Sequence, residues 1–152
     1  MKILLNNNEL NEALLNVSNL GFVPTMGSLH KGHISLIKKS MRLSGNTIVS
    51  IFVNPTQFNN KKDFNNYPRN IKKDLTTLKK LKVNFVYLPT YNKIYNSKRL
   101  REIKISEKDK ILCAKYRKGH FEGVLDIMDR FCLLYTSPSP RDRTRYRMPS
   151  SA

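Results

Sequence analysis

Hydrophobic residues along the chain follow two different spacings. In three stretches they recur three or four positions apart, which predicts amphipathic helices over residues 9–20, 30–43 and 71–81. Three other runs are almost continuously apolar and rich in β-branched residues, which predicts strands covered on both faces over residues 21–25, 47–54 and 83–88. After the first helix, these elements alternate as strand, helix, strand, helix, strand. The pattern therefore predicts an α/β fold with a doubly wound, Rossmann-like parallel sheet and right-handed crossovers.

Caps and breakers refine these bounds. We expect Asn7 or Asn8 to cap the first helix, and Gly21 and Gly45 to end the first two helices. Prolines are expected to close the three strands, at positions 24, 55 and 89. Further along, residues 102–105 suggest a short extra strand. The apolar face of a last helix is predicted to consist of Val124, Leu125, Met128, Phe131 and Cys132.

The composition changes abruptly at Tyr135. Residues 135–152 contain no lysine, asparagine or isoleucine, carry only arginine as a basic residue, and are dense in proline and serine. No core can form from such a segment, and the string is more similar to translated adaptor sequence than to a gene product. We therefore expect residues 1–134 to form one incomplete domain, followed by a disordered, artefactual tail.

Charge and composition limit the function classes. A formal net charge of +17 raises nucleic acid as a partner, but the lysines are spread over every predicted element, which favours a solvated surface and no nucleic-acid partner. No apolar segment approaches the roughly 20 residues needed to cross a membrane. The apolar patch at residues 3–5 is too short for a signal peptide, so we expect a cytoplasmic protein. Cys113 and Cys132 lie in apolar helical patterns, which predicts buried free thiols.

The exit of the first predicted strand has the most unusual sequence, PTMGSLHKGH over residues 24–33. In a doubly wound sheet, ligands bind beyond the carboxyl ends of the strands. His30 and His33 are three residues apart at a predicted helix start, so their rings project from one face of a turn that already favours anions. Imidazole donors aimed at a phosphate are worth roughly 3 to 4 kcal/mol each. This loop therefore predicts phosphate chemistry.

Two glycines in the same loop support this interpretation. Gly27 permits a backbone conformation or a close ligand approach that a side chain would block. Gly32 costs about 1 kcal/mol relative to alanine in a helix, which suggests that something flat lies against the backbone there. Two alternatives remain: a metal site, which needs a third ligand that no spacing reveals, and ordinary helix capping, which would explain one histidine but not two.

The loop resembles the signature of the pantothenate synthetases, members of the nucleotidyltransferase superfamily with an H-x-G-H element. Three further segments match that family's pattern in order: SIFVNPTQF (50–58), NYPRN (66–70) and RKGHFEGV (117–124). The resemblance covers about residues 21–133. It implies an enzyme that joins pantoate to β-alanine at the expense of ATP, through a pantoyl-adenylate, and that functions as a homodimer.

The resemblance also implies site residues. His33 would be the catalytic proton donor and His30 its companion, within an ATP site formed by Met26, Gly27, Ser28, Leu29, His30, Lys31, Gly32 and His33. Gln57 would hold pantoate next to β-alanine, with Asn54, Tyr67 and His120 close by. Mg²⁺ is expected to accompany ATP, but its ligands are unknown. Asp74 resembles a magnesium contact, and a solvated position on its helix is an equally good interpretation.

Parts of the family pattern are absent from the recognisable sequence. The later G-E-K-D segment and the serine-arginine loop that closes over the triphosphate are not found, so we expect this chain alone to be inactive or nearly so. Competing hypotheses are another H-x-G-H nucleotidyltransferase, such as an adenylyltransferase, and a basic RNA-binding module. The first gives no reason for VNPTQF followed by NYPRN, and the second predicts lysines clustered on one face.

Overall fold

Four parallel strands form the centre of the computed structural model, which describes residues 1–95 and 119–134. Their bounds are β1 Lys2–Leu4, β2 Leu20–Thr25, β3 Asn46–Ile51 and β4 Phe85–Tyr87. They are hydrogen-bonded in the order β1-β4-β3-β2, with every pair parallel. The predicted parallel α/β sheet is thus confirmed.

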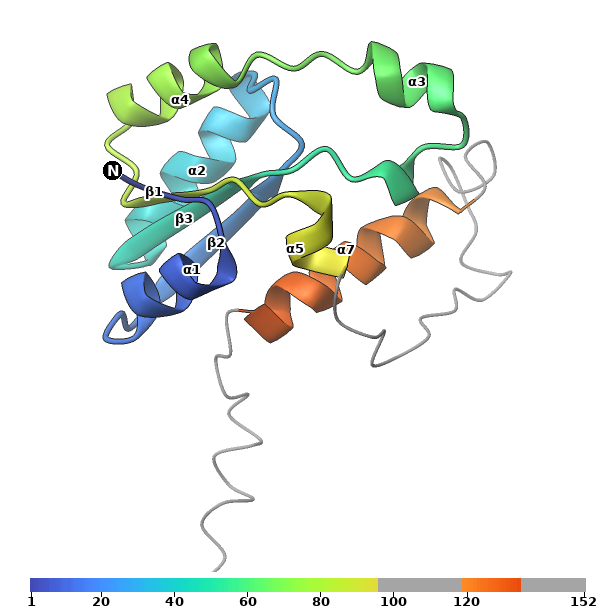
Figure 1. The fold of residues 1–152 in the computed structure, drawn as a ribbon. Helices are drawn as coiled ribbons and strands as arrows, with labels where there is room; N and C mark the ends of the chain where they lie inside the picture. Colours follow the sequence, from blue (N-terminus) through green and yellow to red (C-terminus); the bar gives the residue numbers. More distant parts are fainter. Residues whose placement is uncertain (96–118, 135–152) are drawn as a thin grey trace, which may run out of the picture.

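Helices cover both faces of this sheet, as a doubly wound fold requires (Figure 1). The helices α1 (Asn7–Leu14) and α7 (His120–Leu134) lie on one face, and α2 (Lys31–Leu43) and α4 (Ile71–Lys80) lie on the other. Three short elements complete the described chain: the 3-10 turn η1 (Pro55–Gln57), α3 (Lys61–Asn66) and α5 (Tyr91–Tyr95). Figure 1 shows α3 standing away from the sheet, beyond the ends of the strands.

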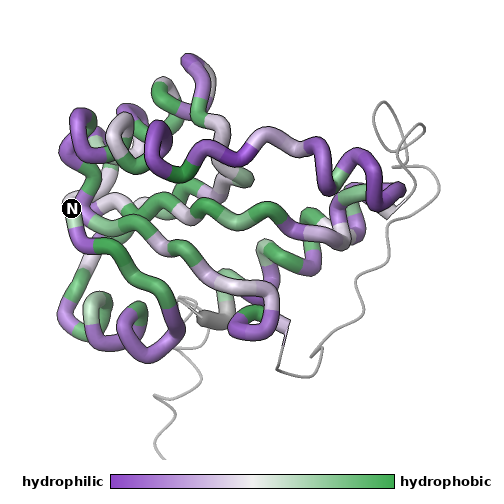
Figure 2. The backbone as a smooth tube through the Cα atoms, turned by 45° about the horizontal axis from the view of Figure 1, so that its top comes forward, coloured by the Kyte–Doolittle hydropathy of each residue, from purple (hydrophilic) through white to green (hydrophobic). Residues whose placement is uncertain are grey.

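The core consists of two layers, one on each side of the strands. Leu10, Ile127 and Phe131 pack with Ile48 and Tyr87 on the α1 and α7 side. On the other side, residues of α2 and α4 pack against the alternate positions of the strands. In β3, residues 47–51 are all buried, which explains the unbroken apolar run in its sequence. Figure 2 shows this apolar centre within a hydrophilic periphery.

The N-terminal region departs from the prediction. Strand β1 was not expected: three residues with an exposed Ile3 leave no clear hydrophobic pattern. The first helix covers Asn7–Leu14 and is capped by Asn6, whose side chain accepts a hydrogen bond from Glu9 N at 2.9 Å. Gly21 lies inside β2 rather than at a helix end. There it allows close packing on α2, because a Cβ would lie 2.1 Å from Ser40 Oγ.

Pro24 does not end β2, which continues to Thr25. Within the described residues β2 pairs only with β3, and an edge strand tolerates a missing N–H. The other two predicted strands are shorter than expected, since β3 ends at Ile51 and β4 covers only Phe85–Tyr87. The short strand predicted at residues 102–105 and the thiol of Cys113 lie outside the described part of the chain.

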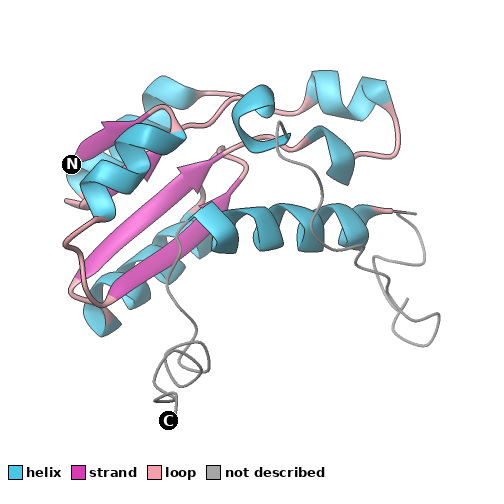
Figure 3. Cartoon of the chain, turned by 60° about the horizontal axis from the view of Figure 1, so that its bottom comes forward, coloured by secondary structure: helices cyan, strands magenta, loops and turns pink. Residues whose placement is uncertain are grey.

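The buried face of α7 is also narrower than predicted. Ile127 and Phe131 are buried against the sheet, and Val124 and Met128 are half-buried. Leu125 and Cys132 are exposed, so the expectation that Cys132 is a buried thiol is wrong. Figure 3 shows one end of α7 beside the strands and the rest of the helix extending past the strand ends. Among the described helices, none is long and apolar enough to cross a membrane.

Candidate active site

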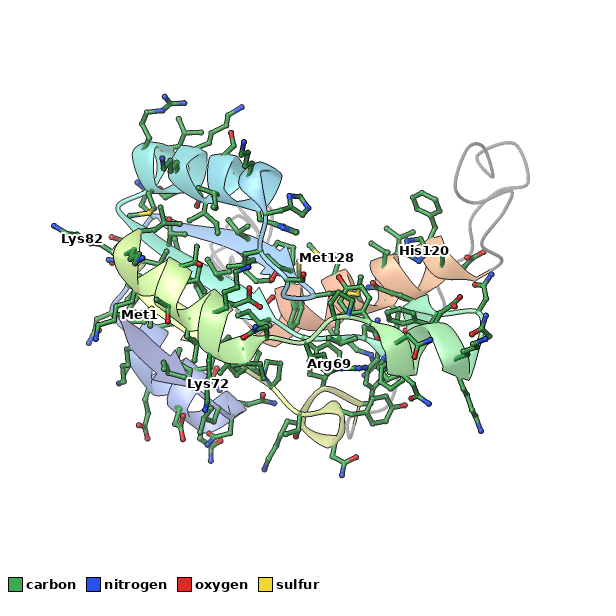
Figure 4. All side chains as sticks on the ribbon, turned by 90° about the horizontal axis from the view of Figure 1, so that it is seen from above. Met1, Arg69, Lys72, Lys82, His120 and Met128 are labelled. Atoms are coloured by element: carbon green, nitrogen blue, oxygen red, sulfur yellow. The ribbon has the colours of Figure 1, made fainter. Side chains whose placement is uncertain are left out.

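Two adjoining cavities lie at the carboxyl ends of β2 and β3. The inner cavity, of about 300 Å³, is walled by Met26 and His33 from the first loop and by apolar residues of α7. The outer cavity, of about 620 Å³, extends toward α3. Four predicted site residues line both cavities: Met26, Gln57, Tyr67 and His120. In Figure 4, His120 and Met128 on α7 lie at this end of the molecule, opposite Met1 and Lys82.

The loop after β2 has an unusual backbone. Gly27 and Ser28 adopt left-handed φ angles of 82° and 54°. At Gly27 a Cβ would lie 3.0 Å from an Asp74 oxygen and 3.1 Å from Ile51, so both space and conformation favour glycine. Thr25 fixes the start of the loop, since its hydroxyl accepts from Gly27 N at 3.1 Å and donates to Ser50 O at 2.8 Å.

Asp74, on α4, fixes the middle of this loop through hydrogen bonds. Its carboxylate accepts hydrogen bonds from Ser28 N at 2.8 Å and from Leu29 N at 2.9 Å, one on each oxygen. The residue is 3% exposed, so the interpretation of Asp74 as a solvated surface residue is wrong. A signal was present in the sequence, because Asp74 is the single acid in the lysine-rich helix α4.

The two histidines begin α2 as reciprocal caps. The Nδ1 of His30 accepts from Gly32 N at 3.1 Å, and the Nδ1 of His33 accepts from His30 N at 3.4 Å. Capping thus explains both histidines, contrary to our expectation that it explains only one. The rings lie 4.0 Å apart at a 40° tilt. The flat group against Gly32 is the His30 ring itself, since a Cβ there would meet it at 3.0 Å.

These caps determine which ring nitrogen can donate. Because each Nδ1 accepts a hydrogen bond, a neutral ring must carry its proton on Nε2. Burial lowers the pKa of His33, the neighbouring His30 lowers it further, and the Asp74 carboxylate opposes both effects. His33 is therefore neutral near pH 7, and its free polar group is an Nε2–H donor in a ring that lines the inner cavity.

The loop after β3 is arranged differently. Gln57 is buried at 9% exposure. Its main-chain carbonyl oxygen lies 2.8 Å from the Nδ1 of His120. A carbonyl only accepts, so this Nδ1 must donate, which leaves Nε2 of a neutral His120 as an acceptor. His33 and His120 line the same inner cavity with opposite hydrogen-bonding character.

Asn54 is not brought into either cavity. It is fully buried, its Nδ2 donates to Gly123 O at 3.2 Å, and its Oδ1 accepts from Tyr95 OH at 2.9 Å and from Thr56 N at 3.3 Å. Its side chain therefore joins η1 to the first turn of α7. Gly123 makes this contact possible, because a Cβ there would lie 2.5 Å from the Thr56 carbonyl oxygen.

Tyr67 is positioned by its neighbours in the NYPRN segment. Its ring packs edge-on against Phe58, with centroids 5.4 Å apart. Burial and then the Asp74 charge raise the pKa of Tyr67, so its hydroxyl stays protonated. Arg69 donates to the carbonyls of Phe64, Asn65 and Tyr67 at 2.6 to 3.2 Å, which closes the end of α3. Asn70 caps α4.

The predicted loop residues therefore have different positions. Of residues 26–33, Met26 and His33 line the inner cavity, whereas His30 and Lys31 are exposed at the start of α2. The backbone amides of Ser28 and Leu29 donate to Asp74 instead of facing a cavity ligand. The apolar wall formed by Phe52, Ile127 and Phe131 was not predicted as part of the site, because its residues are typical of any core.

A parallel sheet with an H-x-G-H helix start at a strand exit is the arrangement of the nucleotidyltransferase-like α/β proteins. The family model for pantoate-beta-alanine ligase matches residues 2–139. The chain belongs to this family. The alternatives of a different nucleotidyltransferase and of an RNA-binding module are not favoured.

Named relatives agree with this assignment. The chain is 46% identical over 114 residues to the pantothenate synthetase of Thermosipho africanus, which covers 73% of this chain and 40% of the relative. For the pantothenate synthetase of Helicobacter pylori the identity is 48% over 113 residues, or 72% and 41% of the two chains. The chain thus spans less than half the length of these relatives.

A solved structure has the same fold. The pantoate-beta-alanine ligase of Francisella tularensis, complexed with beta-gamma ATP and beta-alanine, superposes with a TM-score of 0.83 at 39% identity. The match covers 89% of this chain and 53% of that one. A pantothenate synthetase of Thermus thermophilus superposes with a TM-score of 0.78 at 29% identity, over 89% of this chain and 49% of that one.

Proposed function

We propose that this chain forms the ATP- and pantoate-binding part of a ligase that joins pantoate to β-alanine through a pantoyl-adenylate. The observation that carries the proposal is one cavity that is lined by a donor imidazole, His33, an acceptor imidazole, His120, and the buried Gln57. The ligands named for the Francisella structure support ATP and β-alanine as substrates.

In the first step, the carboxylate of pantoate attacks the α-phosphorus of ATP and pyrophosphate leaves. Negative charge grows on the phosphate oxygens, and Nε2–H donors fixed by capping stabilise it without rearranging during the reaction. Removing one aimed donor of this kind costs roughly 10²- to 10³-fold in rate. We assign this role to His33, with His30 beside it, and we assign the orientation of pantoate to Gln57.

In the second step, the amine of β-alanine attacks the carbonyl carbon of the adenylate and AMP leaves. The amine must lose a proton, and the Nε2 of His120 is a proton acceptor once its Nδ1 is committed to the Gln57 carbonyl. Tyr67, held protonated by burial, lines both cavities. Holding both reactants in one site orients them and reduces the entropic barrier.

Mg²⁺ accompanies ATP in our proposal, but Asp74 does not fit as its ligand. Asp74 is 3% exposed, lines neither cavity, and accepts a backbone hydrogen bond on each carboxylate oxygen. Within the described residues no group of three or more acidic, histidine or cysteine side chains is arranged to hold a metal. Mg²⁺ commonly binds through substrate phosphates and water with few protein ligands, and when bound it would neutralise the triphosphate charge.

Other features of the whole protein rest on the family resemblance. We infer a cytoplasmic homodimer that acts on small molecules and has neither a nucleic-acid nor a membrane partner. A filter-binding titration with RNA at two salt concentrations tests the nucleic-acid part, because a dedicated RNA-binding module loses affinity steeply as salt rises.

Binding and turnover need separate tests, because we expect this chain to bind without efficient turnover. Isothermal titration calorimetry should detect binding of ATP and of pantoate, and His33→Gln should weaken ATP binding about tenfold. Lys38→Gln, on the exposed surface of α2, is the control. Failure of the unmodified chain to bind either substrate would refute the proposed site. Pantoate-dependent ATP–pyrophosphate exchange at an ordinary enzyme rate would refute our expectation of inactivity.

A further inference from the structure

Asp74 is a buried acid whose two carboxylate oxygens both accept hydrogen bonds. It is 3% exposed, and each of its two oxygens accepts a backbone amide hydrogen bond, from Ser28 at 2.8 Å and from Leu29 at 2.9 Å. A buried carboxylate is stable only when its charge is compensated by such bonds. The contact joins α4 to the loop after β2, which lies 45 and 46 residues earlier in the chain.

The loop needs this contact as much as the carboxylate does. Gly27 and Ser28 have left-handed φ angles, so the following amides point away from the sheet ladder and require a partner. A turn of this kind is a binding place for anions, and here the anion is the chain's own Asp74. The loop amides of Ser28 and Leu29 are therefore not available to a phosphate.

The geometry of the histidine pair depends on the same contact. Leu29 is followed directly by His30, the cap of α2, whose own N–H donates to His33. A shift of the Leu29 amide would move the His30 backbone and with it the hydrogen bond that fixes the His33 ring. Phosphate recognition then rests on the imidazole Nε2–H groups. Asp74 on α4 determines their position through its hydrogen bonds to the loop backbone.

We propose that Asp74 is a positioning residue: it clamps the backbone of Ser28 and Leu29, and so sets His30 and His33 for the nucleotide without touching the nucleotide or a metal ion. The statement that the two histidines are set for a nucleotide rests on the proposed function. The hydrogen bonds from Ser28 and Leu29 to Asp74 do not depend on it. The competing role is direct ligation of Mg²⁺, which would require a carboxylate that is 3% exposed and lines neither cavity to reach the ion.

Hydrogen exchange of the unmodified chain is the first test. The amides of Ser28 and Leu29 have no partner in a helix or strand, so protection there reports the clamp directly. We expect exchange at both amides to be slowed about a hundredfold relative to the exposed Lys31 amide. Unprotected amides would overturn the proposal, whether or not any variant folds.

Asp74→Asn is the second test. An amide NH₂ in place of one oxygen faces an N–H donor, so one of the two loop amides loses its partner. We expect ATP affinity to fall about tenfold, with or without Mg²⁺, and the pKa of His33 to fall, because the Asp74 charge raises it. Asp126→Asn removes a buried charge on α7, and Glu12→Gln removes an exposed one on α1. Both should leave the pKa of His33 and the affinity unchanged.

The outcomes separate the possible roles. An affinity loss seen only with Mg²⁺ present would assign Asp74 to the metal and overturn the clamp. Unchanged affinity and unchanged amide protection in Asp74→Asn would overturn it as well. If the unmodified chain does not bind ATP but the amides are protected and the His33 pKa moves as expected, the clamp stands and the proposed function fails.

Discussion

The two loops that wall the inner cavity leave neighbouring strands, yet they are held in opposite ways. The loop after β2 is fixed by side chains that accept hydrogen bonds from its backbone, chiefly Asp74 and the imidazoles. The loop after β3 is fixed by close packing, because Gly123 lies directly against the Thr56 carbonyl, and by the buried side chain of Asn54. The first arrangement leaves ring nitrogens for a ligand, whereas in the second the polar atoms of Asn54 are used inside the protein.

The two loops therefore differ in whether the residues that stabilise the backbone also carry groups that can contact a ligand. In the first loop, side chains that stabilise the backbone also carry reactive groups, since each imidazole caps with one nitrogen and presents the other. In the second loop the tasks are divided: Asn54 supports α7, and Gln57 lines the cavity. Substitutions at the contact between Asn54 and α7 should therefore affect stability most, and those at the histidines of the first loop should affect the site.

Replacing Asn54 should have the largest effect. Asn54→Ala removes three hydrogen bonds at a fully buried position and takes away the side-chain partner of the Thr56 amide. We expect a loss of about 3 kcal/mol in the free energy of unfolding, measured with urea. Asn11→Ala, on the exposed side of α1, is the control. A loss below about 1 kcal/mol would show that packing alone holds α7.

Gly123→Ala should be nearly as damaging. The new methyl would lie 2.5 Å from a backbone oxygen, which cannot turn away, so α7 must move from η1. A loss of about 2 kcal/mol is expected. Gly45→Ala is a matched control, because nothing lies within 4 Å of its Cβ position. Equal stability of the two variants would contradict the close contact.

Gly32→Ala should change stability by less than about 1 kcal/mol, although its methyl would also lie close to a neighbour. That neighbour is the His30 ring, 3.0 Å away, which can rotate. The gain in helix propensity offsets the weakened cap, each being worth about 1 kcal/mol. Nuclear magnetic resonance (NMR) spectra should show displaced His30 ring signals, and calorimetry should show weaker ATP binding. A stability loss as large as that of Gly123→Ala would mean that the first loop is as rigid as the second.

The pH dependence of stability should show the smallest effect. The folded-state pKa of His33 is below the ordinary value of 6.5, so the unfolded chain binds this proton more tightly. The contribution of His33 to stability is therefore complete above pH 6.5 and is lost as the pH falls through its folded-state pKa. An NMR titration of the ring measures this directly, and His33→Gln should remove that part of the pH dependence. A His33 pKa above the ordinary value would exclude the neutral donor.

The sequence predicted what depends on local pattern. The buried run of β3 and the spacing in α2 and α4 led directly to those elements, and the order of elements led to the parallel sheet. Strand β1 was missed because three residues at the edge of a sheet carry too few apolar positions. The first helix was predicted too long because its apolar spacing continues through Leu20, which pairs with β3 instead.

The site shows the same limit. His33, Gln57, Tyr67 and His120 were located by motif, and the structure brings all four to the inner cavity. Asn54 has the right position in its motif, but its direction is set by contacts with Gly123 and Tyr95, which no local pattern reveals. The engagement of Asp74 likewise depends on how α4 lies beside a distant loop.

The separation between Asp74 and its partners has a consequence for biosynthesis. A ribosome releases the histidine loop first, and Asp74 follows 46 residues after Ser28. During that interval the growing chain contains every residue of the loop but lacks the carboxylate that shapes it. The loop can therefore acquire its working form only after α4 has emerged and docked.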